Sequence, residues 1–459
     1  MKITHYALIV LIAIMPTAAW ATAKIKAKPN TNHPRGKIAI AGSGFSANEA
    51  IDVFWDNKKL LFTVNSDNGG AFPKTKAEVP KNALPGAHTI IAKGENGDSA
   101  QAKFTVTTPW VEHGFTSEGA RYNAYENVIS AKNANTLAAT WTAATGGYVI
   151  SSPAVVDGIV YAGSADHKFY AFDAATGAVL WSASTGAGIY SSPAVSNGIV
   201  YVGSNDHNLY AFNAQSSEAL WSAATGAAIE SSPAVARGVV YIGSDDHKLY
   251  AFSAATGGAL WSGMTEGSIS SSPAVANDVV YVGSWDHNLY AFNAATGAVL
   301  WFAATGDRIE FTSPAVADGV VYVGSDDGKL YAFDASTGTV LWTGGTTGPI
   351  FSSPSVAHGI VYVGSVDGWL RAFDTATGAL LWHSLDATGA VNSSPAVANG
   401  VVYAGCNDYR IRAFDAATGT LLWTAVTGFA ISHSSPAVAD GAIYIGSEDK
   451  NLHAYALSK

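Results

Sequence analysis

The chain has 459 residues, of which 48% are apolar, 11% aromatic and only 13% charged, and its formal net charge is −10. Many aromatic and few charged residues exclude an intrinsically disordered protein and a coiled coil, and the acidic balance argues against a general nucleic-acid binder. The single cysteine, Cys406, excludes an internal disulfide, a CxxC zinc site and a CxxCH haem site.

Residues 1–23 have the three parts of a secretory signal peptide. Lys2 gives a positive start, residues 7–15 form an apolar core too short for a membrane span of about 20 residues, and Ala21-Thr22-Ala23 is a small-x-small cleavage site. A membrane anchor is the alternative interpretation. We expect cleavage near Ala23 and an extracytoplasmic protein, periplasmic or secreted, with no transmembrane segment. No cysteine lies near the cleavage site, so we do not expect a lipoprotein.

Residues 24–108 differ in charge from the rest of the chain. They contain 12 Lys and Arg against 7 Asp and Glu, whereas residues 109–459 contain 12 against 28. Short apolar runs, separated by turn sequences such as Asp67-Asn68-Gly69-Gly70, predict a small β-sandwich of about seven strands. The runs are Lys37–Ala41, Ala50–Trp55, Leu60–Val64, Ala77–Pro80, His88–Ala92 and Ala102–Val106.

Four segments of this region form a recognisable series: GSGF at 42–45, DNGGAF at 67–72, LPGAHTI at 84–90 and AKFTV at 102–106. This series resembles bacterial surface immunoglobulin-like domains. The resemblance implies an Ig-like β-sandwich over 24–108, without the cysteine pair of antibody domains. Residues 109–136 are then interpreted as a connector to the next region.

From residue 137 the sequence repeats with a period near 40. Eight prolines follow Ser-Ser or Thr-Ser, at 153, 193, 233, 273, 314, 354, 395 and 436. Eight tryptophans recur with the same spacing: Trp141, Trp181, Trp221, Trp261, Trp301, Trp342, Trp382 and Trp423. A period in this range is typical of propellers and other repeat architectures.

Each repeat contains the signals of four antiparallel strands. In residues 151–181, an Asp-Gly turn, a tight turn at Asp166-His167 and a D-A-A-T-G turn separate the apolar runs. Four strands in about 40 residues are the size of a propeller blade. We therefore predict an all-β chain in which a β-propeller of four-stranded blades occupies residues 137–459.

The two ends of the repeat region predict how the ring closes. Trp141 belongs to a fourth strand with no preceding three, and the chain ends after a third strand with no fourth. We predict that residues 137–142 complete the last blade and give an eight-bladed propeller. The alternative, an open solenoid, leaves the apolar strand near Leu452 without a partner.

The turn between the second and third strands holds His in four repeats. The equivalent residues are His167, His207, His247, His287, Gly328, Gly368, Tyr409 and Lys450. Glycine at two of these positions indicates a backbone with positive φ. We interpret the histidines as turn residues, with metal ligation as the alternative.

The end of each repeat resembles the tryptophan-docking motif of pyrroloquinoline-quinone (PQQ) repeat propellers. Residues 171–181 fit A-x-D-x-x-x-G-x-x-x-W, and variants end at the other repeat tryptophans. The resemblance implies that each indole packs between adjacent blades near the motif glycine. Ser217 replaces that glycine in one repeat, and Asn213, Ser253 and Asn293 replace the aspartate.

The residues three positions before each proline vary while Ser-Ser-Pro stays constant. They are Ile150, Tyr190, Glu230, Ser270, Phe311, Phe351, Asn392 and His433. We expect them to surround one mouth of the channel and to form a ligand or partner face. The residues proposed for this face are Tyr190, Glu230, Trp285, Arg308, Glu310, Phe351, Trp369, Asn392, Tyr409, Arg410 and His433.

The PQQ-like resemblance has catalytic and non-catalytic branches. A resemblance to the quinoprotein dehydrogenases implies PQQ with calcium at the channel mouth. Glu230, Glu310 and Asn392 offer oxygen ligands for the calcium. This chain lacks their adjacent-cysteine disulfide, their long loops and a cytochrome segment. The chain also resembles the outer-membrane barrel-assembly lipoprotein in predicted blade number and compactness, which implies a non-catalytic scaffold. It lacks the lipid-anchor cysteine of that protein and adds a sandwich.

We predict a non-catalytic binding or scaffold protein with no catalytic or metal-ligating residues and no cofactor. A PQQ- and calcium-dependent oxidoreductase is one alternative; a carbohydrate-binding lectin, with sugars stacked on Trp285, Trp369 or Tyr190, is another. We expect a monomer with a protein or cell-envelope polymer as partner and no nucleic acid. The charge asymmetry further predicts that the basic sandwich holds an anionic envelope surface or docks on the acidic propeller.

Overall fold

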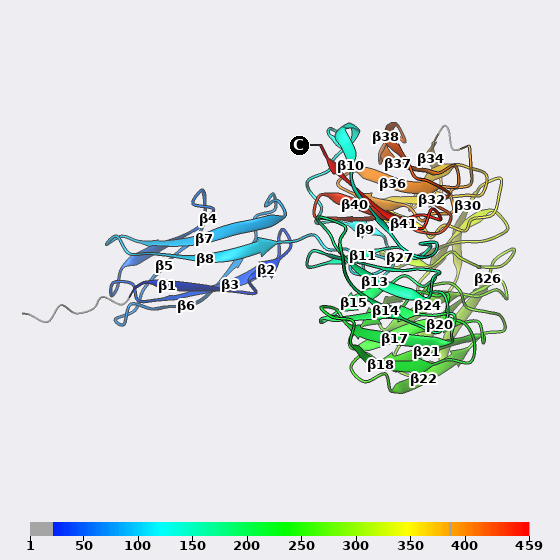
Figure 1. Ribbon diagram of the computed structural model, residues 1–459, viewed down its shortest axis with the longest axis horizontal. Coiled ribbons are helices and arrows are strands. Elements are labelled where there is room, and N and C mark those ends of the chain that lie inside the picture. Colours follow the sequence, from blue (N-terminus) through cyan, green and yellow to red (C-terminus); the bar gives the residue numbers. More distant parts are fainter. Residues whose placement is uncertain (1–21, 385–387, 459) are drawn as a thin grey trace, which may run out of the picture. The chain divides into compact units, whose positions relative to one another are not determined.

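The computed structural model describes residues 22–384 and 388–458 (Figure 1). The chain divides into a first compact unit that ends at Val106 and a second that begins at Thr107. Almost all of the predicted signal peptide, residues 1–21, lies outside the described residues. Within the described part, no helix is long and apolar enough to cross a membrane.

The first unit is a two-layered β structure. One sheet has the order β1 (Lys24–Lys28), β3 (Lys37–Ser43), β6 (Phe72–Glu78). The other has the order β2 (Thr31–Asn32), β8 (Ser99–Val106), β7 (Gly86–Gly94), β4 (Ala50–Trp55), β5 (Lys59–Asn65). Alternate side chains of both sheets meet in one core around Ile40, Ile51, Val53 and Ile90. Six strands overlap the predicted runs, whereas β1 and β2 are not among them.

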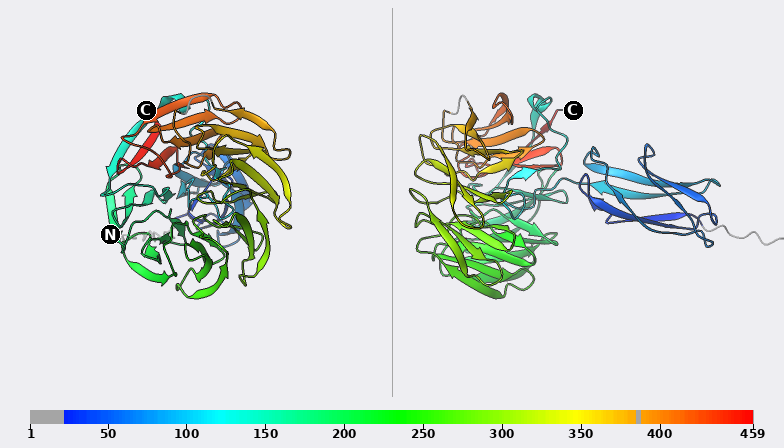
Figure 2. Two further views of the ribbon diagram at one scale, coloured as in Figure 1. Left: turned by 90° about the vertical axis from the view of Figure 1, so that its right-hand side faces the viewer. Right: turned by 180° about the vertical axis from the view of Figure 1, so that it is seen from behind.

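The second unit consists of four-stranded antiparallel sheets around a common axis (Figure 2). We number these blades in chain order. Blade 1 contains β11 (Ala154–Val156), β12 (Ile159–Gly163), β13 (Lys168–Asp173) and β14 (Val179–Ser184). Blades 2 and 3 contain β15 (Ala194–Ser196), β16 (Ile199–Gly203), β17 (Asn208–Asn213), β18 (Ala219–Ala224), β19 (Ala234–Ala236), β20 (Val239–Ser244), β21 (Lys248–Ser253) and β22 (Ala259–Met264).

The next blades follow the same pattern. Blades 4 and 5 contain β23 (Ala274–Ala276), β24 (Val279–Gly283), β25 (Asn288–Asn293), β26 (Val299–Ala304), β27 (Ala315–Ala317), β28 (Val320–Gly324), β29 (Lys329–Asp334) and β30 (Val340–Gly345). Blades 6 and 7 contain β31 (Ser355–Ala357), β32 (Ile360–Gly364), β33 (Leu370–Asp374), β34 (Leu380–His383), β35 (Ala396–Ala398), β36 (Val401–Cys406), β37 (Arg410–Asp415) and β38 (Leu421–Val426).

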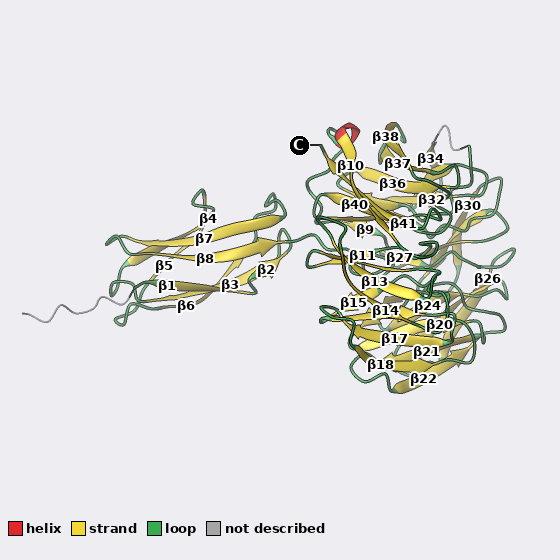
Figure 3. Ribbon diagram, viewed as in Figure 1, coloured by secondary structure: helices red, strands yellow, loops and turns green. Residues whose placement is uncertain are grey.

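Blade 8 joins the two ends of the repeat region. It combines β39 (Ala437–Ala439), β40 (Ala442–Gly446) and β41 (Asn451–Leu457) with β10 (Leu137–Ala144), which follows a short 3-10 turn, η1 (Ala134–Thr136) (Figure 3). β10 pairs antiparallel with β41 from Leu137 opposite Leu457 to Ala144 opposite Asn451. The predicted partner of the last third strand is therefore the one that the structure shows.

The two hydroxyl-bearing residues of each Ser-Ser-Pro or Thr-Ser-Pro segment have separate structural roles. The first residue accepts a hydrogen bond from the backbone amide of a glycine at the end of the second strand of the same blade. Ser151 accepts in this way from Gly163 at 3.1 Å. The second accepts from the preceding blade, and eight such bonds of 2.8–3.0 Å form a closed circuit. The circuit runs through Ser152, Ser192, Ser232, Ser272, Ser313, Ser353, Ser394 and Ser435, and Ser435 donates its amide back to Ser152.

The repeat tryptophans join neighbouring blades. Seven indole N–H groups donate to a backbone carbonyl of the following blade at 2.9–3.2 Å, from Trp141, Trp221, Trp261, Trp301, Trp342, Trp382 and Trp423. In several blades a tyrosine donates to the same carbonyl, as Tyr201 and Trp221 both do to Ala254. The exception is Trp181, whose buried Nε1 has no hydrogen-bond partner among the described residues.

Residues 108–123, which we call the strap, run along the innermost strands of the blades. The strap accepts backbone amide hydrogen bonds from Val155, Val195, Val275, Val316, Val356 and Val397. Val235 donates to the Glu112 side chain, and Asn123 Nδ2 donates to Val438 O. All eight blades are therefore bonded to one segment, and the β9 portion of the strap (Tyr122–Asn123) pairs with β35. The predicted connector, 109–136, belongs to the second unit and includes most of this strap.

The turns between the second and third strands have left-handed backbones at the predicted position. His167, His207, His247 and His287 have φ between 68° and 73°, and the equivalent Gly328, Gly368, Tyr409 and Lys450 also have positive φ. The shared conformation supports the interpretation of these histidines as turn residues. Among the described residues, no group of three or more His, Cys, Asp and Glu is placed to hold a metal ion.

Candidate ligand-binding cavity at the channel mouth

The eight variable positions before the prolines come together in one cavity of about 260 Å3. They alternate around the wall with serines of the hydrogen-bonded circuit, and His113 of the strap also lines the cavity. The variable residues precede the prolines, whereas the strap bonds to the first strands two residues after them. The strap therefore lies nearer the turn between the first and second strands. A second hollow at that end, between the strap and residues such as Pro233, measures about 20 Å3, enough for little more than a water molecule. His113 lines both hollows, so the strap lies at the inner end of the cavity.

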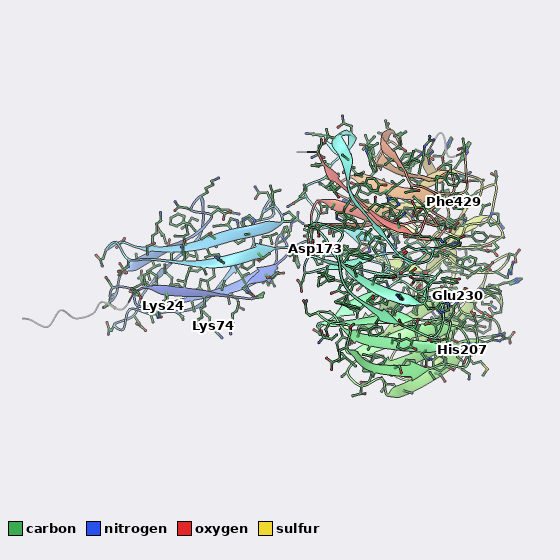
Figure 4. All side chains as sticks on the ribbon, viewed as in Figure 1. Lys24, Lys74, Asp173, His207, Glu230 and Phe429 are labelled. Carbon is green, nitrogen blue, oxygen red and sulfur yellow. The ribbon has the colours of Figure 1, made fainter. Side chains whose placement is uncertain are left out.

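One side of the mouth is acidic. Glu230, which is labelled in Figure 4, precedes blade 3 and lines the cavity. Burial raises its pKa, and the charges of Asp245 and Glu310 raise it further. Before blade 5, Arg308 lies 3.8 Å from Glu310 and 3.5 Å from Asp326. Burial raises the pKa of Asp326 to about 7, with a further contribution from Glu310, while Arg308 lowers it.

Next to this acidic group, the wall before blades 5, 6 and 8 is aromatic. The ring of Phe311 packs edge-on against Phe351 at 5.6 Å and against His433 at 4.9 Å between ring centroids. Burial lowers the pKa of His433, so its imidazole is neutral near pH 7. No lysine or arginine lines the cavity among the described residues. The wall thus has a carboxylate and an apolar face but no cation.

Unused hydrogen-bond acceptors also favour a donor as ligand. Asn392, in the wall before blade 7, has a buried Oδ1 with no hydrogen-bond partner in the described part of the chain. Its blade lies four positions from that of Glu230, so the two acceptors are on opposite sides of the ring. A buried acceptor without a donor is costly, and a ligand with N–H groups would satisfy it.

Several residues that the sequence placed on this face do not line the cavity. The indole of Trp285 is covered on one face by Arg308 at 5.5 Å, and its N–H donates to Ser270 at 2.7 Å. Trp369 stacks on His383 at 4.2 Å, and Tyr409 stacks on Phe429 at 5.1 Å. Arg410 is an exposed residue at the start of β37. Each of the three aromatic rings therefore already packs against another side chain of the protein.

The structure adds three residues to the site. Asp245 and Asp326 lie in the turns between the second and third strands, two positions before the left-handed residue, where the repeats also vary. That variation was a usable sequence signal. His113 had none, because it lies in the strap, which shares no pattern with the repeats.

Two family models match parts of the propeller. The model of the beta-alanine-activating enzyme β-propeller matches residues 195–400, and that of the outer membrane protein assembly factor BamB matches residues 125–229. No curated protein matches this chain.

Solved structures of several kinds share the fold. Quinohemoprotein alcohol dehydrogenase ADHIIG from Pseudomonas putida HK5 is 18% identical with a TM-score of 0.66, over 76% of this chain and 80% of that one. BamB from Moraxella catarrhalis is 19% identical with a TM-score of 0.60, over 70% and 97%. A europium-containing methanol dehydrogenase is 14% identical with a TM-score of 0.67, over 76% and 98%. At such identities the likeness concerns the fold, and together with the repeat models it shows that the second unit is a β-propeller of PQQ-like repeats.

Proposed function

We propose that this chain is an extracytoplasmic, non-catalytic binding protein whose propeller receives a cationic side chain of a protein partner at the channel mouth. The observation that carries the proposal is the cavity at the channel mouth, which has Glu230 in its wall and no lysine or arginine among its described lining residues. An arginine or lysine would place its charged head near the acidic side, and its apolar stem would pack against Phe311 and Phe351.

The electrostatics of the mouth support a cation as ligand. Glu230, Asp245 and Asp326 all have raised pKa values, chiefly because burial disfavours their charged forms. Among the described residues, Arg308 is the one cation that forms ion pairs with this group, through Glu310 and Asp326. An incoming cation would stabilise the ionised carboxylates, so binding should strengthen as the pH rises through about 7.

The cavity does not fit PQQ, the cofactor that the resemblance to PQQ-like repeats suggests. PQQ carries three carboxylates, and sites for such anions use arginine or lysine. The described wall offers Glu230 and neutral His433 instead. Glu230, Glu310 and Asn392 precede blades 3, 5 and 7, so the oxygen ligands suggested for calcium are spread around the ring.

Isothermal titration calorimetry with blocked pentapeptides tests the proposal. We expect heat of binding from a peptide with a central arginine, weaker heat from lysine and none from glutamate. Glu230→Gln should abolish the signal, whereas Glu218→Gln, an exposed change in an outer turn, should leave it unchanged. PQQ with and without calcium is titrated in parallel.

Two outcomes would overturn the proposal. Stoichiometric, calcium-dependent PQQ binding that Glu230→Gln removes would favour an oxidoreductase. Equal heats from the arginine and glutamate peptides would show that the mouth does not select cations.

A further inference from the structure

The sheet formed by β1, β3 and β6 has a lysine-rich outer face. On β1, Lys24, Lys26 and Lys28 are exposed while the residues between them are buried. On β6, Lys74 and Lys76 are exposed, and Figure 4 labels Lys24 and Lys74 on this sheet. Side chains at alternate positions of a strand lie on one face, about 7 Å apart.

The strand register places these lysines in two columns. β3 lies between β1 and β6. Ala39 is the partner of Lys28 on one side and of Lys76 on the other, and Ala41 is the partner of Lys26. Two strand spacings separate the columns by about 10 Å. Small side chains therefore form a floor between two rows of positive charge.

The floor and the columns make a shallow groove. A hollow of about 480 Å3 is lined by Lys28, Lys37, Ala39, Lys76 and neighbouring residues of β3 and β6. Glu78, opposite Lys37, is the one acidic side chain in these three strands. Within the described residues, no ion pair engages any of the six lysines of this sheet. Apart from Glu78, these three strands offer the lysines no opposite charge, so their mutual repulsion favours the binding of anions from outside the chain.

We propose that this groove, here called the lysine groove, binds a linear acidic polysaccharide lying along β3. Carboxylate or sulfate groups on both edges of such a chain would meet the two lysine columns. The strands carry no exposed aromatic residue on which a neutral sugar or a nucleic-acid base could stack. They also present no large apolar side chain that could enter a bilayer, and a hollow suits a single chain better than a flat membrane.

Binding of alginate oligomers to the full chain tests this proposal. Fluorescence anisotropy at low ionic strength should show binding of labelled alginate and none of neutral dextran of similar length. The triple variant Lys26→Gln/Lys28→Gln/Lys76→Gln should weaken alginate binding at least about tenfold, because it removes three positive charges from the two lysine columns. Binding should also weaken as salt is added.

A matched control separates the groove from net charge. Lys58→Gln/Lys59→Gln/Lys103→Gln removes the same charge from exposed positions in or beside the other sheet, and we expect less than about a twofold loss, as the remote charges are screened.

Equal losses in both variants would overturn the proposal, as would the absence of alginate binding by the unmodified chain. Tighter binding of oligothymidylate or of phosphatidylglycerol vesicles than of alginate would overturn it in favour of those partners. The arginine-peptide titration with Glu230→Gln leaves all these lysines unchanged, so the two proposals fail separately.

Discussion

Ser217 shows how one residue changes the contact between two blades. In six repeats the equivalent residue is a glycine with φ near 70°, and a Cβ there would come within 2.5–2.7 Å of the docked indole. In blade 2 the residue is Ser217, and the indole facing that turn is Trp181, the one without a hydrogen-bond partner among the described residues. The substitution and the unsatisfied N–H therefore occur at the same junction.

We predict that Ser217→Gly stabilises the propeller by about 1 kcal/mol, the usual net contribution of one buried hydrogen bond. Trp181 could then approach the turn and donate to the carbonyl of Ala214, which already accepts from Tyr161 at 2.8 Å. The reverse change, Gly257→Ser, should destabilise by about 2 kcal/mol because φ there is +70°. Urea unfolding measures both, with Ser217→Ala as the control. Equal stability of all four proteins would contradict this account.

Glu112 makes stability depend on pH. Burial raises the pKa of this strap carboxyl from 4.5 to about 8, although the amide of Val235 opposes the shift. The folded state therefore holds a proton that the unfolded state releases above pH 4.5. Between pH 4.5 and 8, stability should fall as pH rises, by up to about 1.4 kcal/mol per pH unit.

We expect Glu112→Gln to remove this component. The amide has no charge to bury and can still accept from Val235. Thermal unfolding at pH 5 and pH 8 should show a smaller difference in Tm for the variant than for the unmodified chain. A variant with the same pH dependence as the unmodified chain would refute the role of Glu112.

At the scale of elements, the strap is the part that sequence reasoning missed. The blades were predictable because a 40-residue period repeats the same turns and strands, and the pairing of β10 with β41 followed from counting incomplete repeats. The strap has no period, and it acts mainly through its own backbone carbonyls. Such bonds depend on the path of the chain, which side-chain patterns do not reveal. The serine circuit was hidden for a related reason, since seven of its bonds join residues 40 or 41 positions apart and the eighth joins Ser435 to Ser152 across 283 positions.

Shortening the chain from its N-terminus should therefore have two different effects. A chain that begins at Thr107 retains the strap and should keep a cooperative unfolding transition. A chain that begins at Tyr125 leaves the innermost amides of blades 1 to 7 without their acceptors, and we expect a fall in Tm of several degrees or aggregation. Circular dichroism melting of both chains is the measurement, and identical Tm values would show that the strap is dispensable.

At the scale of the molecule, the two units have separate hydrophobic cores. Residues such as Ile51 and Phe104 form the core of the first unit, and the cores of the second lie within and between its blades. We predict two calorimetric unfolding transitions. Phe104→Ala, which removes a fully buried ring, should lower the Tm of one transition and leave the other unchanged. A single transition displaced as a whole would indicate that the units unfold together.

The candidate site was predictable only in part at this scale. Variation against a constant Ser-Ser-Pro background identified eight of the residues that line the cavity, because a propeller brings equivalent residues to one axis. The same reasoning included Trp369, Tyr409 and Arg410, whose positions on outer turns and strand starts keep them out of the cavity wall. Neighbours such as His383 and Phe429, which cover those rings, could not be inferred from spacing alone.

The pairing of β10 with β41 has a consequence for how the chain is made. β10 is synthesised more than 300 residues before its partner, so an emerging polypeptide holds an orphan strand throughout the assembly of seven near-identical blades. Each nascent third strand offers β10 a competing edge with nearly the same sequence. If β10 paired with one of these third strands, the chain would be trapped as a smaller ring with too few blades. Correct folding during synthesis therefore requires that the fourth strand of each blade pairs with its third strand before β10 does.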